Sequence, residues 1–331
     1  MKRTSCFLLA AVIVLAVIAA SISFFLLSDS AMDDKPGKIR IGNLPVIQGL
    51  PVYLAVEKGY FRDAGLDVEI VRFDSPNQLV DSLMQGRIDF GSTSIASGIT
   101  AIAEYKNPGK LRIYALTGGS KDNPTENIIV PLDSELTSIS GLKGKRFGIL
   151  GGTIQWRTIA RHLLAENGLD MDKDVTIVEL APSLQVPALA SRQIDALLAI
   201  EPMSTLALEK GVGKIIVRGP LETIVSDPFY PGAGVLNVEF AKKFPDVTSK
   251  MIEVINKAIL EINADPQAAK QYLKGYTPLE DSTIYSSPVP LMKSCESLTD
   301  QDREALQRFY DLFSRYKVVD GDLPVEPLLY C

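Results

Sequence analysis

The sequence has little of the chemistry that zinc enzymes and histidine-based triads require. Its 331 residues include one histidine, His162, and three cysteines, Cys6, Cys295 and Cys331, which lie too far apart for a metal cluster. The HExxH, GxSxG, GxxxxGK[ST] and GxGxxG motifs are absent, so the commonest motif-bearing enzymes lack their signatures. We therefore expect no catalytic residue, no metal site and no cofactor.

Positive charge is also in deficit. The 34 Lys and Arg residues face 40 Asp and Glu, and the net charge of −6 offers no general attraction for phosphate backbones. Nucleic acid is therefore not an expected partner. The 46% hydrophobic and 22% charged residues are typical of a globular protein, and the length suffices for two domains.

The N-terminus has the pattern of an export segment. Lys2 and Arg3 precede 21 residues, 7–27, that are apolar except for two serines, and an acidic flank follows. This run exceeds the ~7–15 residues of a signal-peptide core and suffices for a spanning helix of ~20. Small residues also allow cleavage before Ala31. Residues 1–37 are thus an export signal or an uncleaved anchor, and we expect a periplasmic or cell-surface protein.

From residue 38 onward, short apolar strands alternate with amphipathic helices. We expect strands over 39–44, 68–73, 88–91, 147–150 and 175–180. We expect helices over 51–58, after a Ser75 and Gln78 capping box, after Ser92 to Ser94, over 154–167, around 248–263, and over 299–316 with Thr299 and Asp302 as its capping box. This alternation favours a mainly parallel sheet covered on both faces.

The sequence also contains a short internal echo. Residues 83–89 and 189–195 both read Leu, four residues, Ile-Asp, where a helix leads into a strand. Two lobes of similar build explain the echo, and chance is the alternative because only three residues are shared. Two links rich in Gly, Pro and polar residues, 117–131 and 226–238, indicate that the chain crosses between lobes twice.

Residues 40–91 resemble the solute-binding proteins of ABC importers for sulfonates, taurine, nitrate and thiamine-precursor pyrimidines. The distinctive pieces are Gly59-Tyr60-Phe61, Gly65-Leu66-Asp67-Val68, the stretch LKGKRFGI at 142–149, and Ile194-Asp195-Ala196 with Glu201-Pro202. The resemblance spans 38–330. It implies an α/β type II periplasmic-binding-protein fold, with two doubly wound lobes, a ligand cleft and two interlobe crossovers. We expect residues 38–120 and 234–331 to form lobe 1, and 121–233 lobe 2.

The resemblance implies an extracytoplasmic solute-binding protein of an ABC importer. It would capture a small anionic solute of the sulfonate, taurine or nitrate class by lobe closure and deliver it to the permease and its ATPase. We expect a monomer that contacts the membrane only if residues 1–37 remain. Three alternatives stay open: a thiamine-precursor pyrimidine as ligand, a membrane-anchored sensor, and a pyrimidine-synthesis enzyme, whose cysteine-rich segment this sequence lacks.

Ligand contacts are expected at three helix starts that follow strands. These are Gln48-Gly49-Leu50, Ser92-Thr93-Ser94 and Gly152-Thr153. Backbone N–H groups at helix starts suit anions, and open α/β sheets bind ligands at the carboxyl ends of strands. The same hydroxyl residues are equally explained as helix caps.

Two further side chains are ligand candidates. Trp156 could stack on a flat ligand or belong to the core, and Glu201 could pair with an amino group or remain solvated. Both would suit an aminopyrimidine. His162 is expected to be structural.

The two C-terminal cysteines, Cys295 and Cys331, are expected to form a disulfide. Both lie outside the export segment, and disulfides persist outside the cytoplasm. Cys331 is the last residue of a tail that would otherwise be free to fray. Two unpaired thiols are the alternative.

Overall fold

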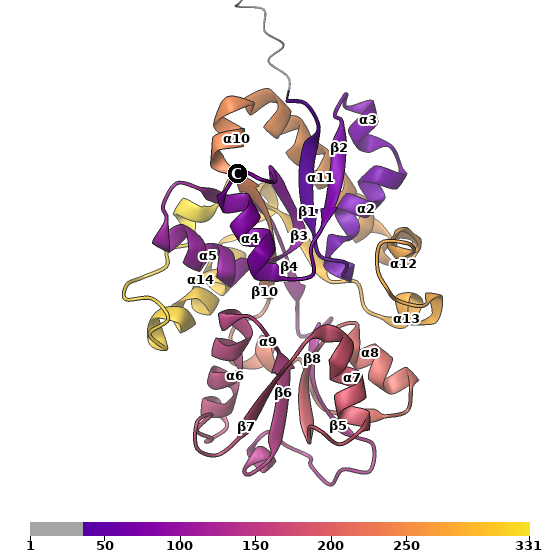
Figure 1. Cartoon of the computed structure of the whole chain (residues 1–331), viewed down its shortest axis with the longest axis vertical. Coiled ribbons are helices and arrows are strands. Elements are labelled where there is room, and N and C mark those ends of the chain that lie inside the picture. The colour runs from indigo at the N-terminus through magenta and orange to yellow at the C-terminus, as the bar shows by residue number, and fades with distance from the viewer. Residues whose placement is uncertain (1–35) are drawn as a thin grey trace, which may run out of the picture. The chain divides into compact units, whose positions relative to one another are not determined.

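Two mixed β-sheets, each with helices packed on it, organise residues 38–331 (Figure 1). The computed structural model describes residues 36–331. The export signal or anchor expected over 1–37 thus lies almost wholly outside the described residues. Within residues 36–331, none of the helices has both the length and the apolarity that crossing a membrane requires.

Lobe 1 is built on a six-stranded sheet with the order β11-β4-β10-β3-β1-β2. The strands are β1 (Ile39–Asn43), β2 (Val68–Arg72), β3 (Phe90–Ala96), β4 (Leu111–Gly119), β10 (Phe229–Asn237) and β11 (Leu291–Ser294). The helices are α2 (Leu50–Glu57), α3 (Tyr60–Asp63), α4 (Pro76–Met84), α5 (Ser97–Lys106), α10 (Val238–Lys243), α11 (Pro245–Ala264), α12 (Pro266–Ala269), α13 (Asp281–Ser286) and α14 (Asp300–Arg315). Helices α2 and α11 belong to one apolar core, and α4, α5 and α14 to another.

Lobe 2 is built on a five-stranded sheet with the order β7-β6-β8-β5-β9, drawn in magenta to rose in Figure 1. Its strands are β5 (Glu126–Pro131), β6 (Arg146–Leu150), β7 (Thr176–Leu180), β8 (Ala196–Ile200) and β9 (Gly213–Arg218). Its helices are α6 (Ile154–Glu166), α7 (Pro182–Ala190), α8 (Met203–Glu209) and α9 (Pro220–Ile224).

The chain passes between the lobes in two segments. It leaves β4 at Gly119 and enters β5 at Glu126, and it returns from α9, which ends at Ile224, to β10, which begins at Phe229. The expected division between residues 233 and 234 falls inside β10. We propose that lobe 2 ends before Phe229, since β10 pairs along its length with the strands of lobe 1.

Both sheets are mixed, although most strands of each run in the same direction, as expected of a mainly parallel sheet. Parallel pairing joins β1 to β2 and β3, and β6 to β7 and β8. Strand β11 is antiparallel to β4, and strands β10 and β5 are antiparallel to both of their neighbours. Strands β10 and β5 are the unexpected ones. Each of these two strands follows a link from the other lobe, so it enters its sheet from the opposite end. The alternation of strands and helices gives no sign of this reversal.

Two expected helix starts also differ in the structure. The expected start at Ser92-Thr93-Ser94 is wrong, because these residues lie inside β3 and α5 begins at Ser97. Pairing with β10 extends β3 as far as Ala96. Ser75 is the N-cap of α4, but its side chain makes no capping hydrogen bond, so the first expected capping box is wrong. The Thr299 and Asp302 capping box is confirmed.

The sequence echo corresponds to the same ion pair in both lobes. The backbone N–H of Arg40 donates to Asp89 over 2.8 Å, and the guanidinium donates to both oxygens of that carboxylate. Arg146 repeats every one of these contacts with Asp195, also with a backbone bond of 2.8 Å. The first pair ties the start of β1 to the residue that precedes β3, and the second ties the start of β6 to the residue that precedes β8. The two lobes therefore share a local build, as the echo predicts.

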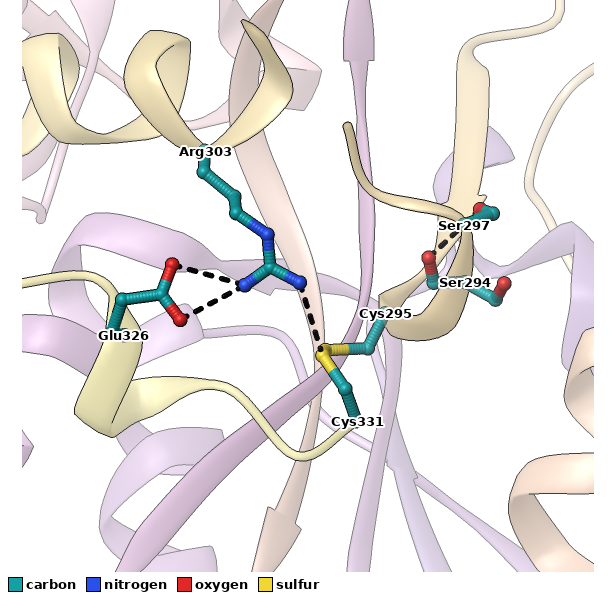
Figure 2. Close-up of a disulfide and its surroundings, with 6 residues drawn as sticks. All are labelled: Ser294, Cys295, Ser297, Arg303, Glu326 and Cys331. Carbon is teal, nitrogen blue, oxygen red and sulfur yellow. Dashed lines mark hydrogen bonds and ion pairs between the residues drawn. A yellow bond between two sulfur atoms is a disulfide. The ribbon is translucent and has the colours of Figure 1, made fainter. Parts of the chain in front are cut away.

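The C-terminal tail is joined to lobe 1 by a disulfide between Cys295 and Cys331, with Cα atoms 5.0 Å apart. Beside it, the guanidinium of Arg303 donates to both oxygens of Glu326 at 3.0 Å and approaches the sulfur of Cys331 (Figure 2). The backbone N–H of Tyr330 donates to the carbonyl of Ile113 on β4. The tail is thus held by covalent, ionic and backbone contacts.

Alkylation of the denatured chain should reveal this disulfide. We expect Cys295 and Cys331 to take a label only after reduction, as read by peptide mass. The bond closes a sequence separation of 36 residues and should contribute at most about 3–4 kcal/mol through the entropy of the unfolded chain. Cys331→Ala should lose as much stability as reduction of the wild type, because both remove only this bond. Labelling of both cysteines without reduction would contradict the assignment.

Candidate functional site

A cavity of about 130 Å³ lies between the two lobes. Since one water molecule needs roughly 10–15 Å³ on the same measure, the space suits a solute of several non-hydrogen atoms. Lobe 1 contributes Leu44, Val46, Gln48, Pro76, Ser94, Ile95, Ala96, Thr117, Gly118, Pro231 and Gly232. Lobe 2 and its entry contribute Thr125, Glu126, Leu150, Gln155, Trp156, Pro182, Gln185, Ile200, Glu201, Pro202 and Met203.

The cavity lies where several strands end and helices begin. Strands β3, β4, β6 and β8 each place their last residues in its wall, and α6, α7 and α8 contribute residues of their first turns. Open α/β sheets bind ligands at this edge because the strand ends leave room between the loops. Half of the lining residues are aliphatic, methionine or proline, and eight carry polar side chains.

Four of the ten expected ligand residues line the cavity: Gln48, Ser94, Trp156 and Glu201. Trp156 is also buried in the main apolar core, which confirms the core role considered for it, and its stacking on a ligand stays a prediction. The carboxylate of Glu201 accepts hydrogen bonds from the backbone N–H and hydroxyl of Thr205 at 3.1 and 2.8 Å. A third bond of 3.4 Å comes from the side-chain amide of Asn127. Glu201 is therefore largely committed within its own lobe.

The remaining six expected residues are not among those that line the cavity: Gly49, Leu50, Ser92, Thr93, Gly152 and Thr153. Ser92 donates to the side chain of Asn43 at 2.8 Å, and the hydroxyl of Thr93 donates to the carbonyl of Gln48. Thr153 is the N-cap of α6 and accepts from the N–H of Trp156. These hydroxyls hold the loops that carry the cavity residues. Their contact with a ligand stays a prediction.

Gly49 is required by close packing. A Cβ at this position would lie 2.6 Å from both the side-chain oxygen of Asn43 and the hydroxyl of Tyr53. The side-chain amide nitrogen of Asn43 donates to the hydroxyl of Tyr53 at 2.7 Å directly beneath the loop. Gly49 thus lets the loop that carries Gln48 approach the sheet.

Five polar residues in the wall were missed by the sequence reasoning: Thr117, Thr125, Glu126, Gln155 and Gln185. Thr117 and Glu126 fall within the segment 117–131, whose polar character we took as that of a linker. The available signal was a glutamate two residues before the apolar run Ile128-Ile129-Val130, at the start of a strand. Gln185 gave no distinguishing signal.

Carboxyl groups dominate the charge around the cavity. Burial, followed by the neighbouring Glu222, raises the pKa of Glu126 well above its usual range. Burial also raises the pKa of Glu222, on α9 behind it, to about 7, and raises that of Glu201. Of the described residues that line the cavity, none is a lysine, arginine or histidine.

Gln155 connects the two lobes across the cavity. Its side-chain oxygen accepts from the N–H of Gly98 at 2.9 Å, and its amide donates to the carbonyl of Pro231 at 3.1 Å. The N-cap residue of α5 is Ala96, which has no side chain able to cap the helix. Gln155 of lobe 2 therefore accepts a hydrogen bond from a backbone N–H group in the first turn of α5, a lobe 1 helix.

Among residues 36–331, no cluster of histidine, cysteine and carboxylate side chains has the arrangement of a metal site. A protein-family model described as NMT1/THI5 like matches residues 47–269 of this chain. This chain belongs to the NMT1/THI5-like family. The family resemblance expected from the sequence is thus confirmed.

Relatives of this chain include proteins named as binding proteins and proteins named as enzymes. A protein of Bacillus subtilis (strain 168) named for binding aliphatic sulfonates is 27% identical over 300 residues, covering 88% of this chain and 85% of its own length. The 4-amino-5-hydroxymethyl-2-methylpyrimidine phosphate synthase THI11 of Saccharomyces cerevisiae is 26% identical over 256 residues, covering 73% and 71%.

A solved structure of the same fold is the alkanesulfonate-binding protein SsuA from Xanthomonas axonopodis pv. citri bound to MOPS. It superposes with a TM-score of 0.71 at 22% identity, covering 89% of this chain and 99% of SsuA. The fold expected from the resemblance, two α/β lobes of the periplasmic-binding-protein type, is confirmed.

Proposed function

We propose that this protein is an extracytoplasmic solute-binding protein of an ABC importer. The observation that carries the proposal is the cavity between the lobes, whose wall is built by both of them. A solute bound there is shielded from water when the lobes close, and opening releases it to a permease with its ATPase. Export, attachment through residues 1–37 and a monomeric state are parts of the same proposal.

The solute that we propose is small and carries an anionic group of the sulfonate, taurine or nitrate class. Helices α6 and α7 begin at the cavity, and the N-cap residue of α5 lines it. Helix starts hold anions through the helix dipole and through those N–H groups that Gln155 and Thr153 leave free, with no need for a basic side chain. The B. subtilis relative and SsuA, both named for sulfonates, support this class.

We propose binding without turnover. The yeast relative is named as a synthase, but the residues lining the described cavity include no histidine and no cysteine, so a nucleophile or acid–base pair of that kind is not at hand. A thiamine-precursor pyrimidine stays as the second candidate solute, since Trp156 and Glu201 both line the cavity. A flat ring would stack on the indole while its amino group faces the carboxylate.

Ligand binding should raise the melting temperature of the purified protein. We expect a shift with taurine, ethanesulfonate, nitrate or 4-amino-2-methylpyrimidine, because a ligand at one hundred times its Kd stabilises by about 2.7 kcal/mol. Calorimetry on the same probes gives the Kd, and mass spectrometry after long incubation checks that the solute is unchanged. Turnover would contradict the binding role. A gene deletion that abolishes uptake separates an importer component from an anchored sensor.

A further inference from the structure

Three buried oxygen atoms of residues that line the cavity have no N–H or hydroxyl donor among the described residues, and the one on Glu126 has only the carboxyl of Glu222 as a hydrogen-bonding neighbour. They are Oγ1 of Thr117, Oε1 of Glu126 and Oε1 of Gln185. All three side chains are at most 1% exposed. They come from β4, β5 and α7, so both lobes contribute to the group.

These unpaired oxygens call for a hydrogen-bond donor. A buried acceptor without a partner costs about 1–3 kcal/mol, and proteins leave few of them. An amide oxygen can only accept hydrogen bonds, and a carboxyl group becomes acceptor-only once it has lost its proton. The oxygen of Gln185 is therefore matched by an N–H or O–H group and opposed by a sulfonate, nitrate or carboxylate oxygen, and the same holds for Glu126 once a cation has displaced the proton of the Glu126 and Glu222 pair.

Charge points in the same direction. Glu126 has Glu222 behind it, and the other oxygen of Glu126 receives only the hydroxyl of Thr125 at 3.0 Å. No cationic side chain lines the described cavity to balance these carboxyl groups. The cheapest way to bury a carboxylate is to pair it with an opposite charge, and only the solute can bring one here.

We propose that Glu126, Gln185 and Thr117 form an acceptor subsite for a positively charged N–H group of the solute, an ammonium or an amidinium. The inference rests on the proposed function, since it assigns one end of the ligand in that cavity. A solute that meets both features carries an anionic group for the helix starts and a cationic nitrogen for the acceptor subsite. A simple alkanesulfonate or nitrate satisfies only the first.

The decisive measurement compares probes that differ by the nitrogen group. Taurine is paired with ethanesulfonate, and 4-amino-2-methylpyrimidine with 2,4-dimethylpyrimidine, and each Kd is measured by calorimetry on the full chain. We expect the nitrogen-bearing member of at least one pair to bind at least tenfold more tightly. Glu126→Gln should remove at least tenfold of that affinity and leave the weaker member of the pair unchanged. Glu239→Gln, an exposed glutamate on α10, is the control and should change nothing.

Proton release offers a second readout that a purely structural role would not move. Because burial keeps the pKa of Glu126 high, a cationic ligand should ionise the carboxyl pair on binding. Calorimetry in phosphate and in Tris should then show protons released by the wild type and fewer by Glu126→Gln. If Glu126→Gln unfolds, Thr117→Val removes one acceptor with little change in volume and should weaken the same probe.

Three outcomes overturn the inference. Ethanesulfonate or nitrate binding as tightly as any nitrogen-bearing probe overturns the acceptor subsite and keeps the proposed function. The inference is also overturned if Glu126→Gln weakens the binding of both members of a pair equally, or if it leaves the affinity for both unchanged. Absence of binding by every probe, together with no small molecule retained by the purified protein, overturns the subsite and the proposed function together.

Discussion

Replacing Asp302 with asparagine should lower the free energy of unfolding by about 3–5 kcal/mol, the cost typical of removing one partner from a buried ion pair. The carboxylate is 1% exposed. It accepts from Lys293 at 2.7 and 2.8 Å, from the hydroxyl of Tyr230 at 2.6 Å, and from the backbone and side chain of Thr299. One residue thus ties α14 to β10 and β11, and the substitution leaves the Lys293 ammonium without its counter-charge.

Asp300 provides the matched control. It lies in the same first turn of α14 but is exposed, so Asp300→Asn removes the same helix-dipole charge without breaking a buried network. We expect a loss below about 1 kcal/mol. Denaturant unfolding measures both variants. Equal effects in the two would show that the network around Asp302 does not contribute.

Acid should remove the difference between wild type and Asp302→Asn. Burial by itself raises the pKa of Asp302. Hydrogen bonds from Lys293, Tyr230 and Thr299 lower it by more, so the pKa lies below the ordinary value for aspartate. A depressed folded-state pKa stabilises above the unfolded value of about 3.9 and loses that contribution as pH falls through the folded value. The two proteins should therefore converge below about pH 4. A gap that persists unchanged at pH 2 would refute the electrostatic origin.

Replacing Gln155 with alanine should weaken solute binding without unfolding the protein. The two hydrogen bonds from Gln155 to Gly98 and Pro231 exist only when the lobes are together. When the lobes separate, water can satisfy both backbone groups, so their loss disfavours closure rather than folding. At about 0.5–1.5 kcal/mol for each bond, the affinity for a solute that the wild type binds should fall roughly 5- to 150-fold.

Asn77 supplies the comparison for this second prediction. Its side chain donates to the carbonyl of Gly152 in the other lobe at 2.7 Å, but this bond is exposed to water. Asn77→Ala should therefore change the affinity much less than Gln155→Ala. Calorimetry gives the Kd values, and small-angle X-ray scattering of each variant with its ligand reports closure. An unchanged Kd in Gln155→Ala would contradict a role in closure.

The order of strands and helices could be predicted because it is encoded locally. Each apolar run and the Thr299 and Asp302 capping box lie within a short stretch of sequence. The echo, which corresponds to the Arg40 and Arg146 ion pairs, repeats a short pattern. Ser92 to Ser94 could not be placed in the same way. Whether β3 stops before them or continues depends on β10, a strand far along the chain that pairs with Ala96.

The candidate site was predicted only in part for a similar reason. Gln48, Ser94, Trp156 and Glu201 were found because they follow strands or stand within the family pattern. Glu126 was missed because its burial beside Glu222 arises only when the link and α9 pack together.

By itself, the sequence determined the α/β class, the family and the short supply of histidine, cysteine and positive charge. Composition and local periodicity survive in any conformation, so they can be known before folding. Only the tertiary structure decided which polar atoms lack partners, because a partner is a matter of distance between segments remote in the chain. The acceptor subsite at Glu126 and the bridge at Gln155 both arise where two lobes meet, and no local pattern encodes that meeting.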